Sequence, residues 1–114
     1  MPGLESPDEI DLIAQDEDGR ALLSIVQTGP WPSGRHVRAG LELKVANYLR
    51  FALEGQMVAK YPVLDGRPVV IELTYDEPPP KPILDAWSRA AKTAMRRGAR
   101  LSTRKLGDES FWSS

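Results

Sequence analysis

The hydrophobic and polar positions near the start of the chain predict a β-hairpin. Residues 10–15, IDLIAQ, alternate in polarity with one more apolar face, which is typical of a strand. Residues 16–19, DEDG, form an acidic turn whose glycine can adopt the positive φ that a bulged hairpin requires. Residues 21–27, ALLSIVQ, are almost continuously apolar. They predict a returning strand that is buried on both faces and central in its sheet.

The period of the apolar positions changes in the middle of the chain. Residues 28–35, TGPWPSGR, contain two prolines and two glycines, so no regular element is expected there. From residue 36 the apolar side chains recur every three or four positions, which predicts a helix over about 36–54 that ends at Gly55. Residues 68–75, PVVIELTY, return to alternation and predict a third strand.

A second helix is expected to begin at Pro82, directly after the prolines that stop the third strand. Ile83, Trp87 and several alanines share one side of this helix, and the small alanines allow a close approach to a sheet. Residues 98–114 have no apolar period and are expected to be a basic, disordered tail.

The order of these elements, β-β-α-β-α, predicts an α+β fold in which two helices cover a three-stranded mixed sheet. The first two strands should be antiparallel, and the passage from 21–27 to 68–75 has room for a right-handed parallel crossover. We expect a flexible arm over residues 1–8, a single domain over 9–97 and the disordered tail after it.

Length and composition narrow the class of protein. The chain has 114 residues, the size of one domain, and 41% of them are hydrophobic. The absence of cysteine excludes disulfides, thiol catalysis and thiolate zinc sites, and it fits a cytoplasmic protein. No signal peptide is recognisable in residues 1–10, and no apolar run has the roughly 20 residues that a membrane helix needs, so no membrane contact is expected.

The net charge of −1 conceals a strong separation of charge along the chain. Residues 1–35 contain seven acidic residues and two arginines, whereas residues 86–107 contain seven basic residues and no acid. A separation of this kind affects binding partners more than it affects the fold.

The first hairpin, in the stretch EIDLIAQDEDGRALL, resembles the core of small endonucleases related to Holliday-junction resolvases. That family requires an Asp on the first strand and Glu-x-Lys on the next, where the carboxylates hold a divalent metal. Asp11 matches the first position, but Ser24 or Ile25 stands where the Glu is needed, and Val26 or Gln27 where the Lys is needed. The resemblance therefore implies a nuclease-like core without its metal site, and neither a cofactor nor catalysis is predicted.

A broader pattern spans residues 8–77 and resembles a family of short bacterial proteins of unknown function. That resemblance implies the architecture above and supplies no activity. It rests on the order and spacing of IDLIA, Trp31, His36, Leu41, Lys44, Tyr48-Leu49, Phe51, Gly55, Tyr61-Pro62, Gly66-Arg67 and Ile71-Glu72.

Single residues that could face a ligand are few. Trp31, set among prolines, is either an aromatic ledge for a ligand or, as we favour, a plug over the open end of the core. His36 is either an acid–base group or a residue that fastens the preceding loop to the helix. Asp11 and Glu72 complete the set, and an enzyme built on these two acids and His36 is the weakest hypothesis. Lys44 lies beside the apolar stripe of the first helix and is expected to extend its amine to solvent.

The basic residues near the C-terminus are the best candidates for binding a partner. On a helix, residues 89, 92, 96 and 100 would share one face, which could neutralise phosphates, dock an acidic protein surface or be a solvated helix end. Our leading hypothesis is a non-catalytic interaction domain that binds another protein or itself, and the acidic residues 5–18 of a second copy are one candidate surface for the basic residues. The alternative is a nucleic-acid-binding domain on a degenerate nuclease-like core. The candidate binding residues are Arg89, Lys92, Arg96, Arg97 and Arg100.

Overall fold

The computed structural model describes residues 12–32 and 35–106, without the side chains of Leu12, Arg35 and His36. Asp11 and the predicted arm over residues 1–8 lie outside the described residues, as do residues 107–114. The elements in chain order are β1 (Leu12–Gln15), β2 (Ala21–Gln27), α1 (Arg35–Leu53), α2 (Gln56–Lys60), a 3₁₀ turn η1 (Pro62–Leu64), β3 (Val69–Tyr75), α3 (Lys81–Arg96) and β4 (Ala99–Lys105).

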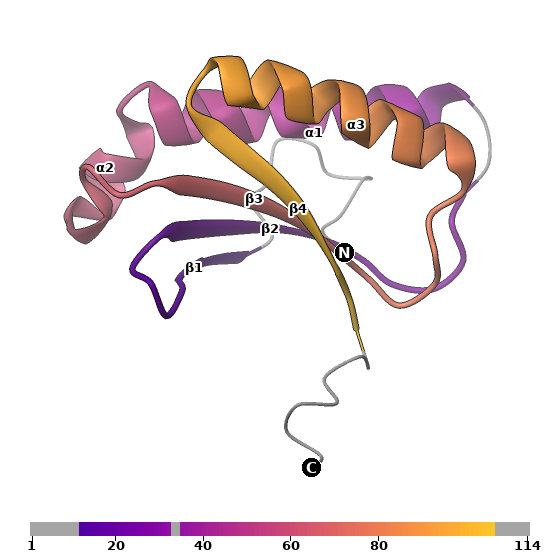
Figure 1. Cartoon of the computed structure of the whole chain (residues 1–114), viewed down its shortest axis with the longest axis horizontal. Helices are drawn as coiled ribbons and strands as arrows, with labels where there is room; N and C mark the ends of the chain where they lie inside the picture. Colours follow the sequence, from indigo (N-terminus) through magenta and orange to yellow (C-terminus); the bar gives the residue numbers. More distant parts are fainter. Residues whose placement is uncertain (1–11, 33–34, 107–114) are drawn as a thin grey trace, which may run out of the picture.

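The strands form one mixed sheet in the order β1-β2-β3-β4. The β1–β2 pair is antiparallel, whereas β2–β3 and β3–β4 are parallel, so the expected parallel crossover is present. The helices α1 and α3 lie side by side on one face of the sheet (Figure 1). No helix in the described part of the chain is long and apolar enough to cross a membrane.

The predicted α+β class and mixed sheet are confirmed, but the number of elements is wrong. The sheet has four strands rather than three, and α2 adds a third helix. The fourth strand, β4, lies in the segment that we expected to be a disordered tail, so the folded domain continues past residue 97. Gly98, with φ of 90°, turns the chain directly from α3 into β4, a conformation that a residue with a side chain rarely adopts.

The core lies between the sheet and its two long helices. In the parallel register Leu23 pairs with Ile71, and Ile71 pairs with Leu101, so one row of side chains faces the helices. Leu23 and Ile71 are fully buried, and Leu101 is partly buried against them. The helices supply the opposing layer, which includes Val37, Leu41, Val45, Tyr48, Ile83, Ala86, Trp87 and Ala94.

Two polar side chains of α1 are enclosed in this core. The Tyr48 hydroxyl donates a hydrogen bond to the Ser24 carbonyl of β2 at 3.0 Å, which ties helix to sheet. Lys44 has no exposed surface, and its Nζ lies 5.6 Å from the centre of the Tyr48 ring. The expectation that Lys44 reaches solvent is therefore wrong, because its amine lies within the packed layer against an aromatic face.

The core predicts a large cost for truncating the central strand. Ile71→Ala should lower the free energy of unfolding by about 2–5 kcal/mol, since it leaves a cavity between β2, β4 and the helices. Leu43→Ala is the matched control, because Leu43 is half exposed on α1. Its effect should stay within about 0.5 kcal/mol. Urea unfolding of both variants checks the prediction, and an equal loss in the two would contradict the assigned core.

Candidate functional site

The five candidate basic residues do not share one helical face. Arg89, Lys92 and Arg96 are exposed residues of α3, but the helix ends at Arg96. Arg97 is the C-cap, and Arg100 belongs to β4. Since Leu101 packs against the core, its neighbour Arg100 points to the opposite face of the sheet. The predicted stripe of 89, 92, 96 and 100 is therefore wrong, because it assumed a helix that continues through Gly98.

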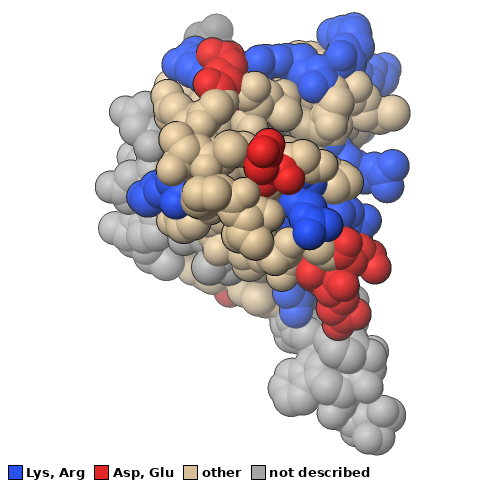
Figure 2. All heavy atoms as spheres, turned by 90° about the vertical axis from the view of Figure 1, so that its left-hand side faces the viewer, with Lys and Arg blue, Asp and Glu red and all other residues tan. Residues whose placement is uncertain are grey.

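Two of these arginines form ion pairs with α1. Arg89 lies 3.5 Å from the Glu42 carboxylate, and Arg97 lies 3.2 Å from that of Glu54. Both pairs are exposed, so each contributes at most about 1 kcal/mol to stability. They nevertheless place acidic groups among the basic ones. Figure 2 shows lysine and arginine side chains gathered in the upper right of the face that it displays, with smaller groups of acidic side chains between and below them.

Beside these basic residues, the outer edge of the strand β4 is a second candidate for binding a partner. Among residues 12–32 and 35–106, no strand pairs with that edge. The Leu106 amide donates to the Tyr75 carbonyl of β3, so even-numbered residues of this segment direct their main-chain groups toward β3. By alternation, the amides of Leu101 and Thr103 point outward. We call β4 with its exposed cations the cationic edge, formed by Arg100, Arg104 and Lys105.

Trp31 is fastened between the loops that follow β2 and β3. Its indole Nε1 donates to the Glu77 carbonyl at 2.7 Å, and the Gly29 amide donates to the Asp76 carboxylate at 2.8 Å. The partly buried ring packs against the core, as expected of a plug. It also lines a cavity, as expected of a ledge. The two interpretations of Trp31 describe the same placement.

The cavity beside Trp31 has a volume of about 670 Å³ and lies where β2 and β3 end. Its walls are almost entirely apolar, and two charged residues, Arg38 and Glu77, complete the lining. We call it the proline groove. Its described lining residues are Pro30, Trp31, Pro32, Val37, Arg38, Glu77, Pro78, Pro80, Pro82 and Ile83. Sequence reasoning missed this groove, because its prolines come from two segments that are distant along the chain.

Of the residues in the enzyme hypothesis, the structure describes the side chain of Glu72. Glu72 is half-buried in β3 between Ser24 and Ser102, on the sheet face away from the helices. Asp11 and the side chain of His36 lie outside the described residues. Within the part of the chain that the structure describes, no three His, Cys, Asp or Glu side chains are arranged to hold a metal ion.

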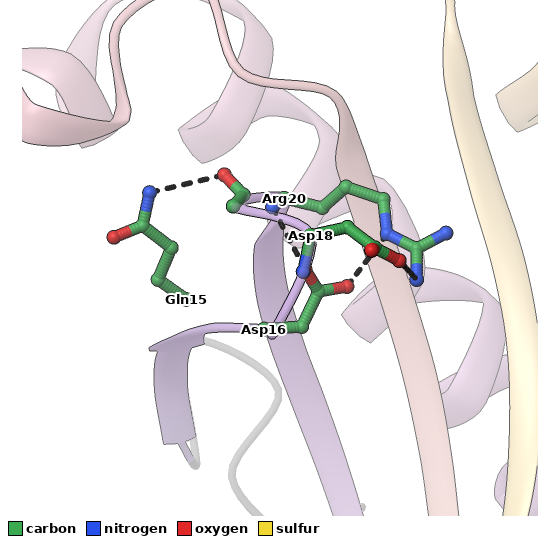
Figure 3. Close-up of polar contacts among 5 residues, drawn as sticks. Gln15, Asp16, Asp18 and Arg20 are labelled. Carbon is green, nitrogen blue, oxygen red and sulfur yellow. Dashed lines mark hydrogen bonds and ion pairs between the residues drawn. The ribbon is translucent and has the colours of Figure 1, made fainter.

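The acidic turn of the first hairpin is organised by Arg20 (Figure 3). The Asp16 carboxylate accepts hydrogen bonds from the Asp18 amide at 3.0 Å and the Arg20 amide at 2.8 Å. Arg20 Nε lies 2.6 Å from Asp16 Oδ2, and Arg20 also pairs with Asp18 at 3.1 Å. Gly19, with φ of 83°, closes the turn. Two of the three acids of the turn are thus used to shape the hairpin.

These contacts change the acidity of Asp16. Desolvation raises the pKa of its carboxyl group, but the hydrogen bonds and positive charge of Arg20, together with the Asp18 amide, outweigh it. The pKa of Asp16 therefore lies below its ordinary value of 3.8. The Asp16 carboxylate also raises the pKa of Arg20, which stays charged.

Fold and sites together define a small α+β domain whose described surface offers a cationic edge and an apolar groove. The chain belongs to a family of unknown function, DUF6572, whose model matches residues 3–106. The resemblance to a family of short proteins without known activity is thereby confirmed, whereas the resemblance to the resolvase-like nucleases gains no support. Searches of the curated proteins and of the solved structures returned no match.

The lowered pKa of Asp16 predicts a pH-dependent contribution to stability. A carboxyl group whose pKa is lower in the folded state stabilises the fold above its unfolded value of 3.8, and this contribution disappears as the pH falls through the folded pKa. Asp16→Asn should therefore be less stable than the wild type at neutral pH, and the difference should shrink below pH 3.8.

Denaturant unfolding measured from neutral to acidic pH checks this prediction. Glu17→Gln is the matched control, since Glu17 is an exposed acid of the same turn. The control should lose less stability at neutral pH than Asp16→Asn. A stability difference for Asp16→Asn that is the same at every pH would contradict the role of the Asp16 carboxylate.

Proposed function

We propose that this chain is a non-catalytic interaction domain that binds an acidic, extended segment of a partner protein along the cationic edge. The observation that carries the proposal is the outer edge of β4, which no described strand covers and which bears exposed Arg100, Arg104 and Lys105. The absence of cysteine supports a cytoplasmic setting for this interaction.

The main chain of β4 favours a polypeptide as the occupant. A strand edge presents amide and carbonyl groups at the spacing of another strand, so an extended segment can bind by adding to the sheet. The side chains set the sign of the partner's charge. Three cations within the last six residues of β4 repel basic segments and attract acidic ones. The same charges disfavour pairing between two copies of β4, because they would bring like charges together.

A nucleic-acid-binding domain remains the alternative, and the observation that favours it is the run of seven basic residues without an acid in residues 86–107. Two features support the protein partner over it. Glu42 pairs with Arg89 of α3 and Glu54 pairs with Arg97 at its C-cap, so both acids would repel phosphates at this surface. The described residues of α3 and β4 present no exposed aromatic side chain for base stacking.

Substitution of Thr103 tests the strand-addition proposal. Proline at this exposed position removes an amide that points away from β3, so the ladder within the sheet is preserved while the outer edge loses a donor. The probe is a fluorescently labelled synthetic peptide of alternating Glu and Val, about as long as β4. We expect Thr103→Pro to weaken its binding at least about tenfold, or about 1.4 kcal/mol. Fluorescence anisotropy measures the affinity.

Three controls make this result specific. Thr103→Ala keeps the amide and should bind the peptide as the wild type does, and a matched Lys/Val peptide should not bind. Labelled single-stranded RNA and duplex DNA are titrated under the same conditions. Equal peptide binding by Thr103→Pro and the wild type would overturn strand addition. Salt-sensitive binding of RNA or DNA with no binding of the acidic peptide would favour the alternative.

A further inference from the structure

The size of the proline groove suits a small molecule. The groove lies outside the carboxyl ends of β2 and β3, which are parallel neighbours. Its volume, about 670 Å³, is within the range of roughly 300–1,000 Å³ that is typical of small-molecule pockets.

The walls of the groove are rigid before any ligand arrives. Its prolines have fixed φ angles, so they lose little freedom on binding. The Trp31 ring is held by its hydrogen bond to the Glu77 carbonyl, and the Asp76 carboxylate fixes the loop through the Gly29 amide. An apolar groove that is already ordered favours binding of a rigid apolar body, because few groups must be immobilised.

The charge at the groove favours an anion beside Arg38. This half-buried arginine of α1 makes no hydrogen bond or ion pair with any described residue. The first turns of α1 and α3 carry no acidic residue, so no side chain of these turns offsets the positive end of either helix dipole. Glu77 is exposed, and solvent therefore screens its opposing charge.

We propose that the proline groove binds a small aromatic carboxylic acid. The ring system lies against Trp31 and the prolines, and the carboxylate pairs with the guanidinium of Arg38. This site is separate from the cationic edge, and the proposal does not depend on the proposed function, since the groove and β4 share no described lining residue.

The experiment uses the full chain and three probes that share one ring system: naphthoate, its neutral amide and naphthylmethylamine. Isothermal titration calorimetry measures their affinities. We expect naphthoate to bind best, the amide at least about tenfold more weakly, and the amine most weakly. Arg38→Met keeps the aliphatic stem and removes the charge. It should weaken the affinity for naphthoate at least about tenfold and leave the affinity for the amide unchanged. Arg50→Met, at the exposed far end of α1, is the matched control and should bind naphthoate as the wild type does.

A second measurement locates the ligand. The methyl resonances of Val37 and Ile83 should shift when naphthoate is added, whereas those of Val63, exposed in the 3₁₀ turn, should not. Circular dichroism and thermal unfolding establish that Arg38→Met is folded. Absence of naphthoate binding to the wild type would overturn the proposal. Equal binding of acid and amine, or an unchanged naphthoate affinity in a folded Arg38→Met, would overturn it as well.

Discussion

Parallel pairing of β2, β3 and β4 is the constraint on which the rest of the structure depends. Parallel neighbours cannot be joined by a tight turn, so each pair requires a crossover, and here the crossovers supply α1 and α3. Because the strands are added in chain order and in one direction, both helices lie on the same face of the sheet (Figure 1). Two long helices thus cover one face of the sheet. The last strand in chain order, β4, lies at the edge of the sheet.

Parallel pairing also explains why the loops after β2 and β3 are joined by hydrogen bonds. The carboxyl ends of the parallel strands lie at the same end of the sheet, so the loops after β2 and β3 become neighbours although they are far apart along the chain. Their hydrogen bonds, from Gly29 to Asp76 and from Trp31 to Glu77, connect the two crossovers at that end of the sheet. At the opposite end of the sheet, β1 contributes only four residues and depends on the hairpin turn that Arg20 organises.

How far the sequence predicts this structure varies from element to element. The helix expected over 36–54 is observed at Arg35–Leu53, and the strand expected over 68–75 at Val69–Tyr75, because both have a clear apolar period. The strand β4 was not predicted, since only Ala99 and Leu101 of its residues pack in the core and the remaining residues are polar or basic. Its identity as a strand depends on the cover that α3 provides, and a local pattern contains no signal of that cover. The proline groove is hidden from the sequence for a similar reason, since each of its two segments alone is typical of a loop.

The charged residues that are separated along the sequence have different roles in the folded structure. Asp16 and Asp18 pair locally with Arg20 and stabilise the turn of the first hairpin. Arg89 and Arg97 pair with α1 and join the two helices. Arg100, Arg104 and Lys105 lie on β4, whose outer edge pairs with no described strand. In the function that we propose, the main-chain groups of β4 would bind an extended segment, and its cations would select a segment of negative charge.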